Sequence, residues 1–166
     1  IKKIQARYQE IIDGLELDLK LDEQFAEIEK NFIAQAGSDY AASRGEFLNG
    51  KIMAAYLGFE FIDAAEVVRF DENGDFQSEI TNEIMSARLE KAKNAVIPGF
   101  YGATEEGRVV TFSRGGSDIT GSLVARAVNA DLYENWTDVS GFLVADPRII
   151  KDPEVIETIT YRELRE

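Results

Sequence analysis

The segment Phe112-Ser-Arg-Gly-Gly-Ser-Asp-Ile-Thr-Gly121 decides the fold class, because it joins the end of a strand to a tight turn and the start of a helix. Gly115 and Gly116 allow the turn, which points backbone N–H groups and the positive end of the helix dipole at one spot. Arg114 stands beside that spot, where its guanidinium can hold a carboxylate or a phosphate through two parallel hydrogen bonds. The segment therefore predicts an anion-binding site on an α/β framework. The local alternative is a plain turn in which Ser117 or Asp118 caps the helix.

Two further polar segments follow about twenty residues later, namely Asn135-Trp-Thr-Asp-Val139 and Asp146-Pro-Arg148. The first stands at an expected strand end, which is where ligands gather in open α/β sheets. Each segment taken alone could also be an ordinary turn. Taken with Arg114, they indicate a small anionic substrate beside a phosphorylated one.

Apolar spacing around these segments predicts strands that alternate with helices. Leu21, Phe25, Ile28 and Phe32 form one apolar helical face, and Asn73-Gly74 is a favoured hairpin pair. The expected helices are 1–36, 41–57, 81–94 and 117–129, the strands 59–62, 95–102, 108–112 and 131–135, and the hairpin 67–80. This order predicts one α/β domain, a three-layer α/β/α sandwich with a mainly parallel sheet.

Two of the expected helices have N-terminal capping signals. Ser43-Arg-Gly-Glu46 matches a capping box, in which the serine caps the third helical N–H group and the glutamate reaches back. Thr81 is the expected N-cap of the helix 81–94. Glu46 is therefore either a capping residue or a ligand-binding carboxylate, and its local sequence leaves both interpretations open.

Composition excludes several classes of function. The 166 residues carry a net charge of −13, which argues against nucleic acids and anionic membrane surfaces as partners. Cysteine and histidine are absent, so catalytic triads, thiol chemistry and most zinc sites are excluded. Catalysis would have to use carboxylates, lysine, arginine, hydroxyls, backbone amides or an oxygen-liganded metal. No apolar run approaches the roughly 20 residues of a membrane span.

Four spaced motifs give the chain a resemblance to the aspartate kinases of the amino-acid kinase family. They occur in the family's order from about residue 38 onward: Ser43-Arg-Gly-Glu46, Pro98-Gly-Phe-Tyr-Gly102, Phe112-Ser-Arg-Gly-Gly-Ser-Asp118, and Trp136-Thr-Asp-Val-Ser-Gly141 with Ala145-Asp-Pro-Arg148. The resemblance implies the amino-acid kinase (carbamate kinase-like) fold. It also implies transfer of the ATP γ-phosphoryl group to the side-chain carboxylate of L-aspartate, the first step toward lysine, threonine and methionine. ATP with Mg²⁺ is the implied phosphoryl donor, and a cytoplasmic homo-oligomer is the expected parent enzyme.

The resemblance also implies roles for individual residues. Arg114 would hold the substrate α-carboxylate with Ser117 and the Gly115 and Gly116 amides nearby, and Asp118 would help to position the reacting groups. Glu46 would accept hydrogen bonds from the substrate ammonium, and Phe100 would form a wall of the pocket. The nucleotide would contact the following residues: Thr137, Asp138, Asp146 and Arg148. No protein side chain is assigned as a metal ligand.

The chain also departs from the family pattern. Its helical residues 1–37 fit the family's variable insertion, while the lysine-glycine phosphate loop, the adenine-pocket segment and the ACT domains are absent. Leu143 stands where an aromatic residue often contacts adenine, and Ser140 replaces a commoner Pro or Asp. The first residue is not Met and the last six resemble the start of a helix. We therefore expect a catalytic-domain fragment cut at both ends and inactive by itself.

Two other functions remain open at this stage. A kinase of the same fold could act on another small acid, such as acetylglutamate or carbamate. Glu46 distinguishes this possibility, because a free ammonium needs an acceptor and an N-acylated substrate does not. The chain could also be a non-catalytic amino-acid-binding or oligomerisation module, for which a missing phosphate loop would be natural.

Overall fold

The computed structural model describes residues 1–136 and 141–160. The chain divides into two compact units, Ile1–Tyr133 and Glu134–Glu166, and each is described by itself. The first unit contains the helices α1 (Lys2–Gly14), α2 (Asp22–Ile33), α3 (Ser38–Leu57), α4 (Ala64–Val67), α5 (Ser78–Leu89) and α6 (Gly116–Ala127). Its strands are β1 (Glu60–Phe61), β2 (Ala95–Val96), β3 (Tyr101–Ala103) and β4 (Val109–Thr111).

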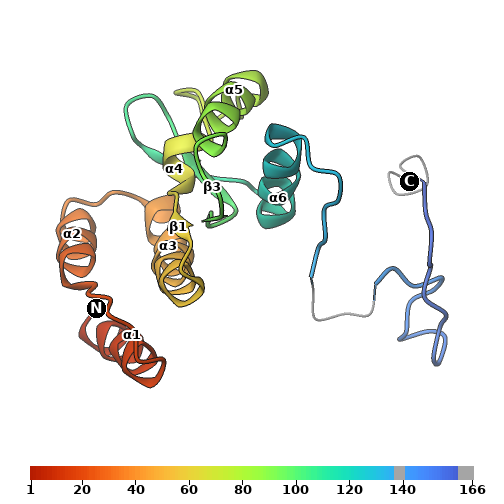
Figure 1. Cartoon of the computed structure of the whole chain (residues 1–166), viewed down its shortest axis with the longest axis horizontal. Helices are drawn as coiled ribbons and strands as arrows, with labels where there is room; N and C mark the ends of the chain where they lie inside the picture. The colour runs from red at the N-terminus through yellow and green to blue at the C-terminus, as the bar shows by residue number, and fades with distance from the viewer. Residues whose placement is uncertain (137–140, 161–166) are drawn as a thin grey trace. The chain divides into compact units, whose positions relative to one another are not determined.

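The strands form two small sheets between helices. β1 and β2 are parallel, with Glu60 opposite Ala95, whereas β3 and β4 are antiparallel, with Tyr101 opposite Thr111. α3 lies on one side of these strands, and α5 and α6 lie on the other (Figure 1). The α/β/α layering that the sequence predicts is thus confirmed. The parallel pairing joins β1 to β2, while β3 and β4 form a separate antiparallel hairpin.

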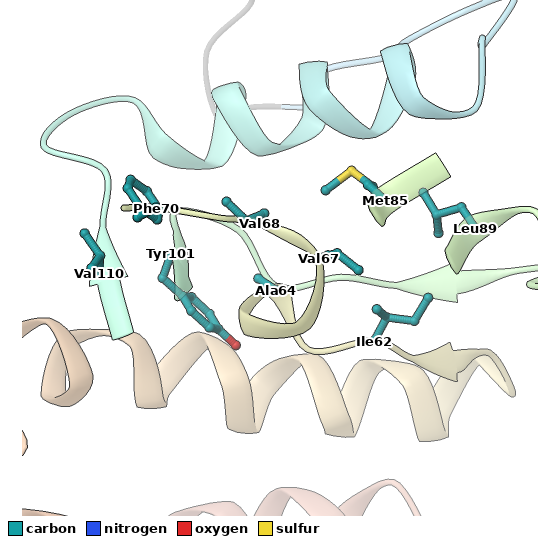
Figure 2. Close-up of a cluster of buried hydrophobic side chains, with 9 residues drawn as sticks. All are labelled: Ile62, Ala64, Val67, Val68, Phe70, Met85, Leu89, Tyr101 and Val110. Atoms are coloured by element: carbon teal, nitrogen blue, oxygen red, sulfur yellow. The ribbon is translucent and has the colours of Figure 1, made fainter. Parts of the chain in front are cut away.

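The main hydrophobic core lies between α3 and α6 (Figure 2). Its buried members come from α4, α5, β3 and β4, from the residue after β1 and from the segment after α4: Ile62, Ala64, Val67, Val68, Phe70, Met85, Leu89, Tyr101 and Val110. Apolar residues of α6, including Leu123 and Val124, pack against this cluster. Each fully buried Val, Ile or Met side chain contributes roughly 1.5–3 kcal/mol to stability, so this core holds the layers together.

The N-terminal helices α1 and α2 build a second core against α3. Leu21, Phe25 and Ile28 are buried there, as the expected helical face requires, but Phe32 is 41% exposed. The helical prediction for 1–36 is confirmed as two helices joined by the segment 15–21. This pair packs against Leu48 and Ile52 of α3.

Both predicted capping motifs are wrong in detail. α3 begins at Ser38, so Ser43 lies inside it, fully buried, and its hydroxyl donates to the Tyr40 carbonyl at 2.9 Å. α5 begins at Ser78, and the buried Thr81 instead accepts a hydrogen bond from the Arg69 N–H group at 2.9 Å. In each case the hydroxyl is used in a buried contact, because tertiary packing places it away from a helix end.

Two other local predictions have mixed outcomes. The turn at Asn73-Gly74 is confirmed: Gly74 has a φ of 91°, and its N–H group donates to the Asp71 carbonyl at 3.0 Å. The strand expected at 131–135 is wrong, because this segment is irregular. Within the first unit, β2 forms backbone pairs with β1, and residues 131–133 pair with no strand there.

The described residues of the second unit fold back on themselves. Val144 donates its N–H to the Glu154 carbonyl at 3.0 Å, and Ile156 donates to the Phe142 carbonyl at 2.7 Å. Leu143 forms an antiparallel bridge with Val155. In the part of the chain that the structure describes, no helix has the length and apolar character needed to cross a membrane.

Candidate active site

Two loops of the first unit are stacked against each other at the start of α6. A Cβ atom added to Gly99 would lie 3.0 Å from the Cα of Ser117, and one added to Gly116 would lie 2.7 Å from the Cα of Phe100. Only glycine permits such close backbone approach. The structure therefore brings together the loop before β3 and the turn before α6, and with them three predicted site residues, Phe100, Gly116 and Ser117.

Phe100 adopts a backbone conformation that is rare for its residue type. Its φ is 65°, in the left-handed region, and its half-buried ring packs near Tyr101 with centroids 5.9 Å apart. Its N–H group donates to Thr120 Oγ1 at 3.1 Å, and its carbonyl accepts from the Phe112 N–H at 2.9 Å. Such backbone strain costs about 1–3 kcal/mol and persists at functional sites where surrounding contacts enforce it.

The N-terminus of α6 is suited to bind an anion. Its N-cap is Gly115, with a φ of 61°, and no side chain of a described residue caps the helix. The interpretation in which Ser117 or Asp118 caps α6 is therefore wrong. Its first-turn N–H groups and the helix dipole remain directed at the space before Gly116, where a carboxylate or phosphate is stabilised.

The side chains around this helix end are accessible. Arg114, Ser117 and Asp118 are all exposed. Arg114 forms no hydrogen bond or ion pair with any residue that the structure describes, so its five donors are available to a ligand. Asp118 lies in the first turn of α6, where a carboxylate is favoured by the helix dipole.

Glu46 lies on the face of α3 that contacts these loops. Asp39 accepts a hydrogen bond from the Thr111 N–H at 3.2 Å, and a Cβ atom added to Gly50 would lie 3.5 Å from Pro98. Glu46 follows Asp39 by seven residues and precedes Gly50 by four, so all three share one helical face. Its carboxylate is exposed, and no capping box employs it. Glu46 thus shares this helical face and also lies near Tyr8 of α1, where burial and the Glu46 carboxylate raise the pKa of the phenol.

A cavity of about 610 Å³ adjoins the stacked loops. Gly99, Ser117 and Thr120 line it together with apolar side chains that include Ile97 and Val124. This volume falls within the range of small-molecule sites, and its mixed lining is typical of them. Among the described residues that were predicted to bind a ligand, only Ser117 contributes to this wall.

Sequence reasoning missed three polar residues that shape the site. Thr120 holds Phe100 and also donates to the Gly116 carbonyl at 2.8 Å, while the buried Tyr101 hydroxyl donates to Asp63 Oδ1 at 2.7 Å. Burial and the Asp63 carboxylate raise the pKa of Tyr101. Of these three, Asp63 could have been found from the sequence, because it directly follows the expected strand 59–62. Polar residues at the ends of strands in α/β sheets often belong to ligand sites.

The second unit contains the predicted nucleotide contacts. Asp146 and Arg148 form an ion pair at 2.6 Å, and the Arg148 Nε also donates to Asp146 at 3.0 Å. This hydrogen bonding lowers the pKa of Asp146. The pair is thus a local turn that presents a guanidinium, 88% exposed, to solvent. Thr137 and Asp138 lie outside the described residues.

The described residues contain no cluster of acidic side chains that could hold a metal ion by itself. Among residues 1–136 and 141–160, no group of three or more acidic side chains lies close enough together to hold a metal ion. Mg²⁺ in nucleotide sites is commonly held by one or two carboxylates together with the substrate phosphates. If Mg²⁺ binds at the described residues, the phosphate groups of the nucleotide must therefore supply most of its oxygen ligands.

Comparison with known proteins identifies the family. Residues 4–166 match the amino acid kinase family. The chain is 39% identical to aspartokinase 3 of Bacillus subtilis over 140 residues, covering 77% of this chain and 30% of that protein. It is 35% identical to an aspartokinase of Rickettsia prowazekii, covering 77% of this chain and 30% of that protein.

Solved structures agree with this result. The crystal structure of aspartate kinase from Clostridium acetobutylicum has a TM-score of 0.89 and 54% identity, covering 99% of this chain and 38% of that one. E. coli aspartokinase III in complex with aspartate and ADP shares the fold, with a TM-score of 0.70 and 23% identity over 91% of this chain and 40% of that one. The chain spans about a third of the length of these relatives. It belongs to the amino acid kinase family.

Proposed function

We propose that the full-length protein is an aspartate kinase, which transfers the γ-phosphoryl group of ATP to the side-chain carboxylate of L-aspartate. One observation carries this proposal: the uncapped N-terminus of α6 lies between an unpaired Arg114 and the strained Phe100. Such an arrangement suits a small anion and supports the proposal that a second group recognises the ligand beside it. The similarity to aspartate kinases supports the identity of the acceptor.

The described residues would fix aspartate by its charges. Arg114 would hold the α-carboxylate through two hydrogen bonds, with the Gly116 and Ser117 amides beside it. Glu46 would accept from the ammonium, Phe100 would exclude water, and Asp118 would orient the reacting groups. Phosphoryl transfer depends on positioning and on charge stabilisation more than on covalent chemistry, so a chain without histidine or cysteine can contribute to it.

The nucleotide would bind at the second unit. Thr137 and Asp138 would contact it, and the exposed guanidinium of Arg148, oriented by Asp146, would flank its phosphates. Mg²⁺ would arrive with the phosphates and neutralise part of their charge. We further propose that the enzyme is a cytoplasmic homo-oligomer that supplies the biosynthesis of lysine, threonine and methionine.

The test is a coupled assay of ADP release by the full-length enzyme. L-Aspartate should support turnover, whereas N-acetyl-L-aspartate should not, because its amide offers Glu46 no ammonium. N-Acetylglutamate and carbamate test the other acids that this fold could phosphorylate. Turnover with either of these and none with L-aspartate would refute the assignment, and no turnover with any acceptor would favour a non-catalytic binding module.

A further inference from the structure

Arg44 is a buried cation at the centre of the Ser43-Arg-Gly-Glu46 motif. It is only 9% exposed, and its guanidinium carbon lies 4.5 Å from the ring centroid of Tyr40, 4.6 Å from Phe47 and 5.4 Å from Tyr101. Its Nε and Nη2 groups donate to the Ser43 hydroxyl at 3.1 and 2.9 Å. It forms no ion pair with the residues that the structure describes.

Burying the Arg44 guanidinium costs more free energy than burying an apolar side chain in the same place. Burying a charge without a carboxylate partner carries a desolvation penalty of roughly several kcal/mol. Stacking on aromatic rings returns about 0.5–2 kcal/mol for each favourable contact. A methionine or leucine would fill the same space without desolvation. Stability alone therefore does not account for an arginine at this position, which suggests a positional role.

Arg44 connects α3 to the strand that carries the substrate wall. Tyr101, the first residue of β3, directly follows Phe100, and its hydroxyl points toward α3 (Figure 2). That hydroxyl donates to Asp63 Oδ1 at 2.7 Å, and the same oxygen accepts from the Ala65 N–H at 3.0 Å. The Tyr101 ring is therefore fixed, and the guanidinium stacked on it ties α3 to this fixed point.

Because Arg44 and Glu46 are on the same helix, fixing Arg44 against Tyr101 also fixes the orientation of Glu46. Because a helix is rigid over two residues, a rotation of α3 about its axis that shifts Arg44 against Tyr101 turns Glu46 by the same angle. A roll of α3 by about 20° would move a carboxylate ~6 Å from the helix axis by ~2 Å. Displacements of this size are enough to weaken an oriented substrate contact substantially.

We propose that Arg44 is a positioning residue, which sets the distance between Glu46 and Phe100 and thereby the affinity for the amino-acid substrate. This inference rests on the proposed function, because it assigns Glu46 and Phe100 to the aspartate pocket. Arg44 itself does not touch the substrate. Its loss should therefore change the KM for aspartate while leaving the nucleotide site unaffected.

The experiment compares Arg44→Met and Arg44→Lys with the wild-type full-length enzyme. Arg44→Met keeps the apolar stem and removes the guanidinium, and we expect the KM for aspartate to rise about tenfold. Arg44→Lys keeps a cation over the rings but loses the planar stack and the fork toward Ser43, so a rise of about threefold is expected. The KM for ATP should change less than about twofold, because the residues proposed to contact the nucleotide do not include Arg44 or its partners.

Arg88→Met is the matched control, because it also removes an arginine of the fold. Arg88 on α5 pairs with Glu60 and is 30% exposed, so its loss should lower stability without changing the KM for aspartate. A wild-type enzyme without aspartate-dependent ADP release would refute the proposed function. If the wild type is active and the variants Arg44→Met and Arg44→Lys, or whichever of them is soluble, keep the wild-type KM for aspartate, the positioning role is refuted. A purely structural role would reduce the melting temperature and the active fraction but leave that KM unchanged.

Discussion

The Phe100 backbone N–H group donates to the Thr120 hydroxyl at 3.1 Å, and this bond holds Phe100 at a φ of 65°. The same hydroxyl donates to the Gly116 carbonyl at 2.8 Å. One buried side chain thus joins the loop before β3 to the first turn of α6. Because a phenylalanine does not adopt this φ without support, the shape of the candidate pocket depends on Thr120.

Thr120→Val should therefore disturb the pocket although it preserves side-chain volume. It leaves the half-buried Phe100 N–H group without its acceptor, which costs up to about 1–3 kcal/mol of stability. We expect a lower denaturation midpoint and a higher KM for aspartate. Thr120→Ser retains the hydroxyl and should keep the KM near the wild-type value. Equal KM values for the valine and wild-type enzymes would show that Phe100 is held by other contacts.

Arg114→Ala should weaken aspartate binding and turnover in the full-length enzyme. Loss of one partner of a desolvated, hydrogen-bonded charge pair costs roughly 2–5 kcal/mol, so a change of at least 30-fold in kcat/KM for aspartate is expected. Arg114→Lys keeps the charge without the fork and should recover only part of this loss. ATP affinity, measured by calorimetry, should change much less. Wild-type kinetics for aspartate would exclude the role.

Gly116→Ala should push the stacked loops apart. The added Cβ would lie 2.7 Å from the Cα of Phe100 and 2.9 Å from the Cβ of Phe112, so one of these residues must move. We expect a loss of stability of about 1–3 kcal/mol together with weaker aspartate binding. Gly14→Ala is the control, because nothing lies within 4 Å of its added Cβ. Unchanged aspartate binding in a folded Gly116→Ala protein would contradict the close approach seen here.

Tyr101 should make the protein sensitive to alkali. Burial and the neighbouring Asp63 carboxylate raise the pKa of its phenol above the ordinary value of 10.0. Above pH 10 the unfolded chain loses this proton while the folded protein keeps it. The contribution of Tyr101 to the free energy of unfolding is therefore fully present below pH 10 and decreases as the pH rises above it. Urea midpoints between pH 8 and 11 should fall less steeply for Tyr101→Phe than for the wild type. Parallel slopes would mean that Tyr101 does not control alkaline unfolding.

The sequence by itself determined the layered α/β class and the glycine turn that opens α6. Both follow from local physics: apolar spacing specifies helices, and Gly115 with Gly116 permits a turn that opens a helix. The position of Arg114 beside that helix end follows from the chain alone. The helix α6 was accordingly expected at 117–129 and begins at Gly116.

Only the tertiary structure decided which polar residues support the site. Ser43 and Thr81 have the local sequence of helix caps, yet both are buried inside helices, because packing of α3 and α5 in the fold outweighs about 1 kcal/mol of capping energy. The same competition fixes Phe100 in a strained conformation and places Arg44 against Tyr101, 57 residues further along the chain. Neighbouring residues cannot specify such contacts, since these arise only when α3, β3 and α6 pack together.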